Sequence, residues 1–149
     1  MYNIKLIKFI SIIFISFILS MKVLSAEKFI ISGDTIIYDT FKAKNELNQE
    51  INWDDVTEFE YLMRNNEGIK NLQLNSSGGL VEAAIYFSDI IIDYELNTHV
   101  DGECSSSCVF LFLGGEKRTL QRGSWIGFHK SSWSKEGLKE YYESYKDEK

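Results

Sequence analysis

The sequence predicts a single α/β domain built on a mostly parallel sheet. From Ile69 onward, strand-like and helix-like segments alternate three times, an order that favours parallel strands joined by helices. The 149 residues include no proline, no internal repeat and no low-complexity linker that would divide the chain. A chain of this length supports one modest hydrophobic core, so we expect one domain.

Residues 1–26 have the layout of a secretory signal peptide. Two lysines precede the apolar stretch from Phe9 to Leu19, and the small residues Ser25-Ala26 end the segment. The apolar stretch is shorter than the roughly 20 residues of a membrane-spanning helix, which favours cleavage over permanent anchoring. We expect cleavage after Ala26, which leaves a domain of 123 residues (149 minus 26) at positions 27–149. The protein is therefore expected to be exported, either periplasmic or secreted from a bacterium.

The charge and the cysteine count exclude some classes of partner. The formal net charge of -6 becomes -9 without residues 1–26, because three lysines and no acid are removed. Such a surface is a poor match for nucleic acid, whose phosphates are bound mainly by Lys and Arg. The only cysteines, Cys104 and Cys108, are too few for a typical zinc site, so we expect no metal and no cofactor. They form either a disulfide, which export permits, or two buried thiols.

The first half of the domain predicts a hairpin and a helix. Residues 28–40 contain two β-branched runs around Ser32-Gly33-Asp34, which is typical of a β-hairpin. The next periodic segment predicts a helix from Trp53 to Met63, with two aspartates in its first turn, where they favour the helix dipole. Its apolar stripe comprises Trp53, Val56, Phe59, Leu62 and Met63.

The second half predicts strands that lead directly into glycine- or serine-rich turns. Residues 69–76 predict a short strand, followed by Ser76-Ser77-Gly78-Gly79 and a helix from Leu80 to Tyr94. The apolar stripe of this helix comprises Leu80, Ala83, Ala84, Phe87, Ile91 and Tyr94. The segments expected after it are a strand at Asn97–Asp101, a short helix through Leu113, a strand within Gly123–His129 and a final helix from Ser134 to about Lys146.

Three serines between the two cysteines are candidates for a nucleophile. The segment "GECSSSCVFLFLGG" follows a predicted strand and begins a predicted helix, so a serine there lies beside free backbone N–H groups. The alternative is that Ser105, Ser106 or Ser107 only caps the helix. Gly78-Gly79 occupies a second strand-to-helix junction, where glycine allows a substrate carbonyl to approach a backbone N–H or simply forms a turn.

The candidate general base is His129, at the end of the strand "WIGFH". A neutral imidazole near pH 7 suits this role, although a histidine at a strand end can also be structural or face solvent. His99 competes for the role, but alternation in "NTHVDGE" buries Val100 and points His99 elsewhere.

Taken together, "LNSSGGLVEAAIYFSDII", "GECSSSCVFLFLGG" and "GSWIGFH" resemble the ClpP/crotonase superfamily, especially its exported ClpP-like members. The resemblance implies a spiral ββα fold and a serine peptidase mechanism. It places the nucleophile at Ser106, the base at His129, and the two oxyanion-hole amides at Gly79 and Ser107. The histidine lies 23 residues after the serine (129 minus 106), which fits the family's order and spacing.

Two features depart from the family pattern. The family's triad acid lies well beyond the histidine, whereas this chain ends 20 residues after His129 with no acid at a matching position. A shortened C-terminus, a different acid such as Asp101, or weak or absent catalysis would each account for this. A Ser-Lys dyad with Lys117 or Lys130 is another catalytic option. The mature chain is also shorter than the superfamily's full core, which implies that outer helices are missing or supplied by a second copy.

The resulting hypothesis is an exported ClpP-like serine hydrolase, a peptidase acting on peptide or protein substrates. The alternative from another class is a catalytically inactive ClpP-like module for binding or assembly. A crotonase-type acyl-CoA enzyme is a third reading, which export disfavours because CoA esters are cytoplasmic. The superfamily commonly forms rings, so a homo-oligomer is compatible with either of the first two readings.

Overall fold

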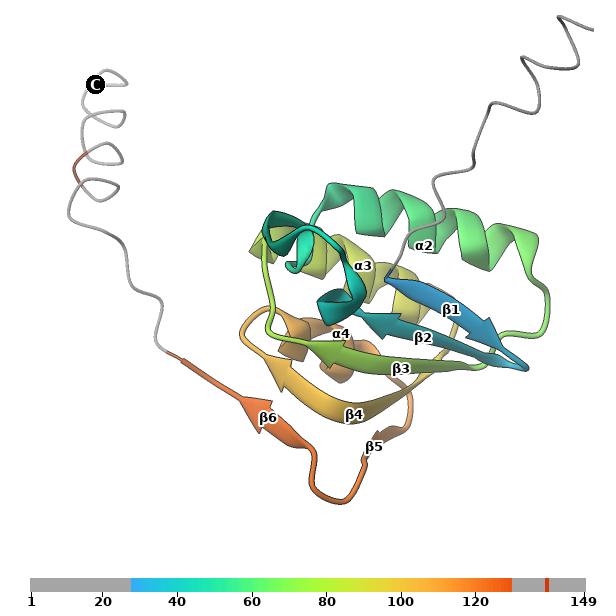
Figure 1. The fold of residues 1–149 in the computed structure, drawn as a ribbon. Helices are drawn as coiled ribbons and strands as arrows, with labels where there is room; N and C mark the ends of the chain where they lie inside the picture. The colour runs from blue at the N-terminus through green and yellow to red at the C-terminus, as the bar shows by residue number, and fades with distance from the viewer. Residues whose placement is uncertain (1–27, 130–138, 140–149) are drawn as a thin grey trace, which may run out of the picture.

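The computed structural model describes residues 28–129 and Lys139. Within these residues the chain forms a six-stranded sheet with its α-helices on one face (Figure 1). The elements in chain order are β1 (Phe29–Ser32), β2 (Thr35–Asp39), η1 (Thr40–Lys42), η2 (Glu46–Asn48), α2 (Trp53–Asn65), β3 (Asn71–Ser76), α3 (Val81–Asp93), β4 (Asn97–Ser105), α4 (Cys108–Gly114), β5 (Arg118–Leu120) and β6 (Trp125–Gly127). The final helix predicted from Ser134 lies outside the described residues. In the described part, no helix has the length and apolar character needed to cross a membrane.

The hairpin and the parallel sheet are confirmed. β1 pairs antiparallel with β2 around a turn at Gly33, where φ is +62°. β2, β3 and β4 then pair in parallel, joined by the helices that lie over the sheet. This order brings the carboxyl ends of β3 and β4 to the same edge, where functional groups gather in open α/β sheets.

β4 is longer than the sequence predicts and includes the first serine of the triplet. The prediction ended this strand at Asp101, but pairing continues to Ser105 because a bulge interrupts the register without ending the strand. Leu74 pairs with Val100 and Ser76 with Cys104, so β4 contains two extra residues. The Asn75 side chain stabilises the bulge by accepting a hydrogen bond of 2.9 Å from the Glu103 N–H.

Two short strands share the outer edge of β4. β5, which the sequence did not predict, pairs in parallel with Thr98–Val100, and β6 pairs in parallel with Glu103–Ser105. β6 covers only the middle of the predicted Gly123–His129 strand. Between the two, the Gly102 N–H donates a 2.7 Å hydrogen bond to the Ser124 hydroxyl. β6 therefore joins β4 only beyond the bulge, next to the serines.

The core lies between the sheet and the helices, and four aromatic rings form its centre. Phe29, Tyr38, Phe59 and Phe87 pack with ring centroids 4.3–6.2 Å apart. Most residues of the two predicted helix stripes are buried. The prediction that the stripes bury Trp53, Leu80 and Tyr94 is wrong, because these side chains are 43–45% exposed. Trp53 packs edge-on against Tyr86 at the surface. These three residues lie at helix ends, where the stripe no longer faces the sheet.

A buried polar network joins the start of the domain to the first helix. One carboxylate oxygen of Asp55 accepts hydrogen bonds from the Lys28 ammonium at 2.9 Å and the Tyr38 hydroxyl at 2.8 Å. Asp55 also forms a capping box with Asn52 at the beginning of α2. Lys28 and Asp55 are only 5% and 4% exposed. Each side chain neutralises the charge of the other, because a single buried charge without a partner would be costly.

Tyr38 makes this network sensitive to alkaline pH. Burial, reinforced by the charge and the hydrogen bond of Asp55, raises the pKa of the Tyr38 phenol well above its usual value near 10. The native state therefore keeps the phenol protonated at pH values where the unfolded chain releases the proton. The stabilisation is complete below pH ~10 and is lost as the pH rises toward the native pKa.

We predict that Tyr38→Phe lowers the free energy of unfolding at pH 7 by about 1–3 kcal/mol, because the Asp55 carboxylate loses a donor. The difference in the free energy of unfolding between wild type and variant should narrow above pH ~10. At these pH values the unfolded wild-type chain is stabilised by ionisation of the Tyr38 phenol, which the variant lacks. Urea unfolding at pH 7 and pH ~10.5 measures both effects. Tyr61→Phe, at a 61% exposed position, should change stability by less than about 0.5 kcal/mol. A gap that widens at alkaline pH would contradict this assignment.

Candidate active site

The segments that follow β3 and β4 lie directly against each other. A Cβ atom built on Gly78 would lie 2.7 Å from the Ser106 Cβ and 2.8 Å from the Ser105 carbonyl oxygen. Gly78 also has φ of +106°, which side chains rarely allow. A glycine at this position is therefore what lets the two strand ends come together.

Ser106 occupies a strained turn between β4 and α4. Its φ is +54°, in the left-handed region that costs a non-glycine residue about 1–2 kcal/mol. Its N–H donates to the Gly127 carbonyl at 3.0 Å, and its carbonyl accepts from the Val109 N–H at 3.1 Å. Backbone strain of this kind is concentrated at functional sites, and hydrolases use a sharp strand-to-helix turn to expose a nucleophilic serine.

The three serines have three different environments. Ser105 is buried in β4, and its hydroxyl packs against Gly127. A Cβ atom added to Gly127 would lie only 2.3 Å from the Ser105 hydroxyl oxygen. Ser106 is half-buried in the turn and lines a cavity. Ser107 is buried at the first position before α4, yet its side chain caps nothing and donates instead to the Gly79 carbonyl at 3.0 Å. Simple helix capping therefore does not describe this segment.

A cavity of about 340 Å³ brings Ser106, Ser107 and His129 together. Ser105 pairs with Gly127 across the parallel ladder, so the chain after β6 runs beside the serine turn and places His129 at the cavity. The other described residues that line it are apolar, namely Val81, Val109, Phe110, Leu113 and Phe128. The cavity thus combines a serine and a histidine with a wall suited to an apolar side chain.

Gly79 is held beside the serine turn but is not among the described residues that line the cavity. Ile51 donates to the Gly78 carbonyl and accepts from the Leu80 N–H, both at 2.8 Å, which leaves the Gly79 N–H outside this bridge. Among the described residues, neither the Gly79 N–H nor the Ser107 N–H has a hydrogen-bond acceptor. Neither amide is therefore engaged within the described part of the chain.

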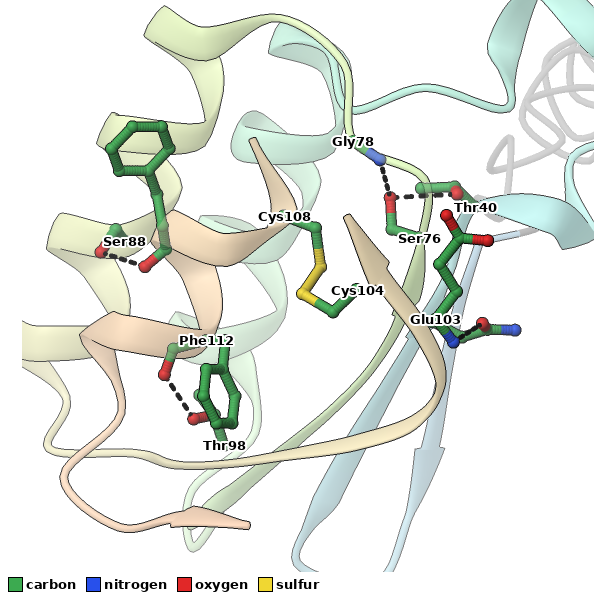
Figure 2. Close-up of a disulfide and its surroundings, with 11 residues drawn as sticks. Thr40, Ser76, Gly78, Ser88, Thr98, Glu103, Cys104, Cys108 and Phe112 are labelled. Carbon is green, nitrogen blue, oxygen red and sulfur yellow. Dashed lines mark hydrogen bonds between the residues drawn. A yellow bond between two sulfur atoms is a disulfide. The ribbon is translucent and has the colours of Figure 1, made fainter. Parts of the chain in front are cut away.

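Ser76 is a supporting residue that the sequence reasoning did not single out. Its fully buried hydroxyl accepts a 3.1 Å hydrogen bond from the Gly78 N–H and one of 3.2 Å from the Thr40 hydroxyl (Figure 2). The sequence does contain a signal for its burial, because Ser76 lies two residues after Leu74 and therefore on the same inward face of β3. Ser76 therefore connects the glycine turn to the chain that follows β2.

The two cysteines are joined by a disulfide that spans the three serines (Figure 2). The alpha carbons are 5.3 Å apart, and both side chains are fully buried in the core. The sequence left a disulfide and two free thiols as alternatives, and the structure has the disulfide. The bond links the last part of β4 to the first residue of α4.

Asp101 is not among the described residues that line the cavity with His129. Its carboxylate is exposed and accepts a 3.3 Å hydrogen bond from Gln73. It comes four residues before Ser105, whereas His129 comes two residues after Gly127, the partner of Ser105. Asp101 lies in the bulged part of β4, whereas His129 lines the cavity. The acids after His129 lie outside the described residues.

Lys117 does not suit the Ser-Lys alternative. It immediately precedes β5, and its carbonyl accepts a 2.8 Å hydrogen bond from the Thr98 N–H. Thr98 is near the opposite end of β4 from Ser106, so Lys117 lies at the opposite end of the strands from the serine turn. Lys130 lies outside the described residues. In the described part, no group of three or more His, Cys, Asp or Glu side chains forms a metal-binding cluster.

Comparison with solved structures supports a ClpP-like fold. The ClpP1 N165D mutant from Listeria monocytogenes matches with a TM-score of 0.51 and 22% sequence identity. The match covers 63% of this chain and 60% of the ClpP1 chain, so the similarity spans less than two thirds of that protein. No protein-family model and no curated protein matches the sequence. At this identity the comparison bears on the fold alone.

We predict that Ser107→Ala lowers the free energy of unfolding by about 1 kcal/mol, because it removes the hydrogen bond to the Gly79 carbonyl. Thermal or urea unfolding measures the change. Ser77→Ala is the matched control, since Ser77 is exposed in the same turn, and it should shift stability by less than about 0.5 kcal/mol. Equal effects of the two substitutions would contradict the proposed link between the two turns.

Proposed function

We propose that this chain is an exported ClpP-like serine hydrolase that cleaves peptide bonds. The observation that carries the proposal is the meeting of Ser106 and His129 at one cavity, with Ser106 in a strained turn. Nucleophilic catalysis by serine needs a base and fixed backbone donors, and residues of each kind surround this cavity. The ClpP-like architecture agrees with the proposal at the level of the fold. The spiral ββα arrangement of the ClpP/crotonase superfamily is part of the same proposal.

In the proposed mechanism, His129 removes the proton from the Ser106 hydroxyl as its oxygen attacks the peptide carbonyl carbon. The N–H groups of Gly79 and Ser107 stabilise the negative oxygen of the tetrahedral intermediate. His129 then donates the proton to the leaving amine, and an acyl-enzyme forms. Water, activated by the same imidazole, hydrolyses the acyl-enzyme and regenerates the Ser106 hydroxyl.

The geometry supports this division of roles among the backbone groups. The Ser107 hydroxyl donates to the Gly79 carbonyl, which fixes the two peptide segments relative to each other. Neither of the two N–H groups has a hydrogen-bond acceptor among the described residues. Donors that are held in place before the reaction need no reorganisation when charge develops, which is the main source of oxyanion stabilisation.

The cavity wall favours an apolar side chain next to the cleaved bond. Val109, Phe110 and Leu113 come from α4, and Val81 comes from the start of α3. We therefore propose peptides or unfolded proteins with apolar residues as substrates, and a homo-oligomer as a compatible assembly.

A fluorophosphonate probe tests the nucleophile. The Ser106 oxygen should attack phosphorus, forming an O–P bond while the P–F bond breaks and fluoride leaves. We expect labelling of the folded protein, complete loss of labelling in Ser106→Ala, and a decrease of about 100-fold or more in His129→Ala. Mass spectrometry identifies the labelled residue.

Matched controls separate this site from other serines and acids. Ser77→Ala should retain labelling because Ser77 is exposed and is not among the described residues that line the cavity. Asp101→Asn should retain it within about twofold, because the Asp101 carboxylate is exposed, bonds Gln73 and is also not among the described lining residues. A folded wild-type protein that takes up no probe would overturn the enzyme and favour the non-catalytic binding module. A large loss in Asp101→Asn would contradict the position that we assign to that residue.

We also propose that export produces a chain that begins at Glu27. The buried disulfide supports an oxidising compartment, because disulfides rarely persist in the cytosol. Expression of the full gene in a bacterial host should yield a periplasmic or secreted protein of 123 residues (149 minus 26). Intact-mass measurement and N-terminal sequencing determine the cleavage site. A cytoplasmic product that retains Met1 would contradict export.

A further inference from the structure

We propose that the Cys104–Cys108 disulfide is a positioning device for Ser106, so that activity depends on the oxidised form of the protein. This inference rests on the proposed function of Ser106. The bridge joins residues only four apart in sequence, and the residues enclosed are the three serines. The two cysteines therefore act as positioning residues that work through the backbone of the turn.

The short span argues for a local role of the disulfide. In the chain-entropy account, a disulfide stabilises a fold by constraining the unfolded chain, and the effect grows with the length of the closed loop. A bridge over four residues constrains the unfolded chain least. Its largest effect is therefore expected on the geometry of the enclosed turn.

Both ends of the bridge are anchored in rigid elements. Cys104 lies in β4 between two parallel neighbours, paired with Ser76 of β3 and Ile126 of β6. Cys108 is the first residue of α4 and is fully buried. The bond between them keeps the start of the helix at a set distance from the end of the strand, which restrains the serine turn from both sides.

We expect the backbone of the serine turn to relax when the disulfide is removed. Ser106 has a left-handed backbone that is unfavourable for a residue with a side chain. Without the bridge, the hydrogen bonds at Ser106 and the Ser107 contact with Gly79 are the remaining restraints on the turn. A return of Ser106 toward ordinary backbone angles would move both its hydroxyl and the Ser107 N–H away from the cavity geometry.

The helix itself has other attachments, so loss of the bridge should leave the fold intact. The Ser88 hydroxyl donates to the Phe110 carbonyl at 3.0 Å, and the Thr98 hydroxyl donates to the Phe112 carbonyl at 2.8 Å (Figure 2). These bonds hold α4 to α3 and to β4 independently of the sulfur atoms. The apolar wall that α4 contributes to the cavity should therefore persist, while the serine turn loosens.

The test compares three forms of the full mature protein on a fluorogenic peptide and on the fluorophosphonate probe. The forms are the oxidised wild type, the wild type reduced by dithiothreitol, and Cys104→Ala/Cys108→Ala. Reduction transfers two electrons to the disulfide, which yields two cysteine thiols and the cyclic disulfide of dithiothreitol. Because the bridge is buried, complete reduction is verified by alkylation and mass measurement, and retention of the fold by circular dichroism.

We expect kcat and the labelling rate to fall by about tenfold to 100-fold in both altered forms, because a displacement near 1 Å has effects of this size. KM should stay within about threefold, since the apolar wall is retained. Reoxidation should restore the reduced wild type. Ser88→Ala, which removes an attachment of α4 but keeps the bridge, should leave kcat within about twofold.

Hydrogen exchange of residues 103–109 provides a readout that does not require catalysis. Protection of this segment should fall on reduction, while that of β2 and β3 stays unchanged. Unchanged protection, or a folded double variant that reacts within twofold of wild type, would overturn the proposal. If the oxidised wild type takes up no probe, the proposed function fails, and hydrogen exchange alone decides whether the bridge holds the turn.

Discussion

Parallel pairing of β4 with β3 on one side and with β6 on the other brings three chain segments to one edge of the sheet. The glycine turn follows β3, the serine turn follows β4, and His129 follows β6. Each strand ends one to three residues before its functional group, so the ladder hydrogen bonds determine the spacing of those groups. The bulge in β4 is essential here, because it carries the strand past Asp101 and delivers Ser105 opposite Gly127.

The close approach of these turns is possible because a glycine occupies one side of each contact. Gly78 meets the Ser106 turn, Gly127 covers the Ser105 hydroxyl, and the Gly79 backbone lies against Ile51. Side-chain hydroxyls then form hydrogen bonds with the backbone of the glycine turn. The Ser76 hydroxyl accepts from the Gly78 N–H, and the Ser107 hydroxyl donates to the Gly79 carbonyl. The site is thus built on backbone contacts between turns, and the aromatic core and the Lys28–Asp55–Tyr38 network stabilise the layer beneath it.

Much of the architecture was readable from residue patterns. Alternating apolar residues located β2 and β3, and helical periodicity located α2 and α3, because burial of one face imposes a period that the sequence must repeat. The predictions were wrong at element ends. Trp53, Leu80 and Tyr94 fit the stripes but are exposed, β4 continues to Ser105, and β5 was not predicted. These features depend on which distant segment packs against or pairs with each element, and the local sequence does not encode that partner.

The sequence by itself determined the order of the main strands and helices, the position of His129 at the end of a strand, and the small residues at the turns that meet. Only the tertiary structure decided the distinct environments of the three serines, the disulfide, and the positions of Asp101 and Lys117 relative to the cavity. The physical reason is that a residue's type and period reflect its own backbone and burial. The direction of a hydroxyl or the reach of a carboxylate depends on strand register, and register is set by contacts between segments far apart in the chain.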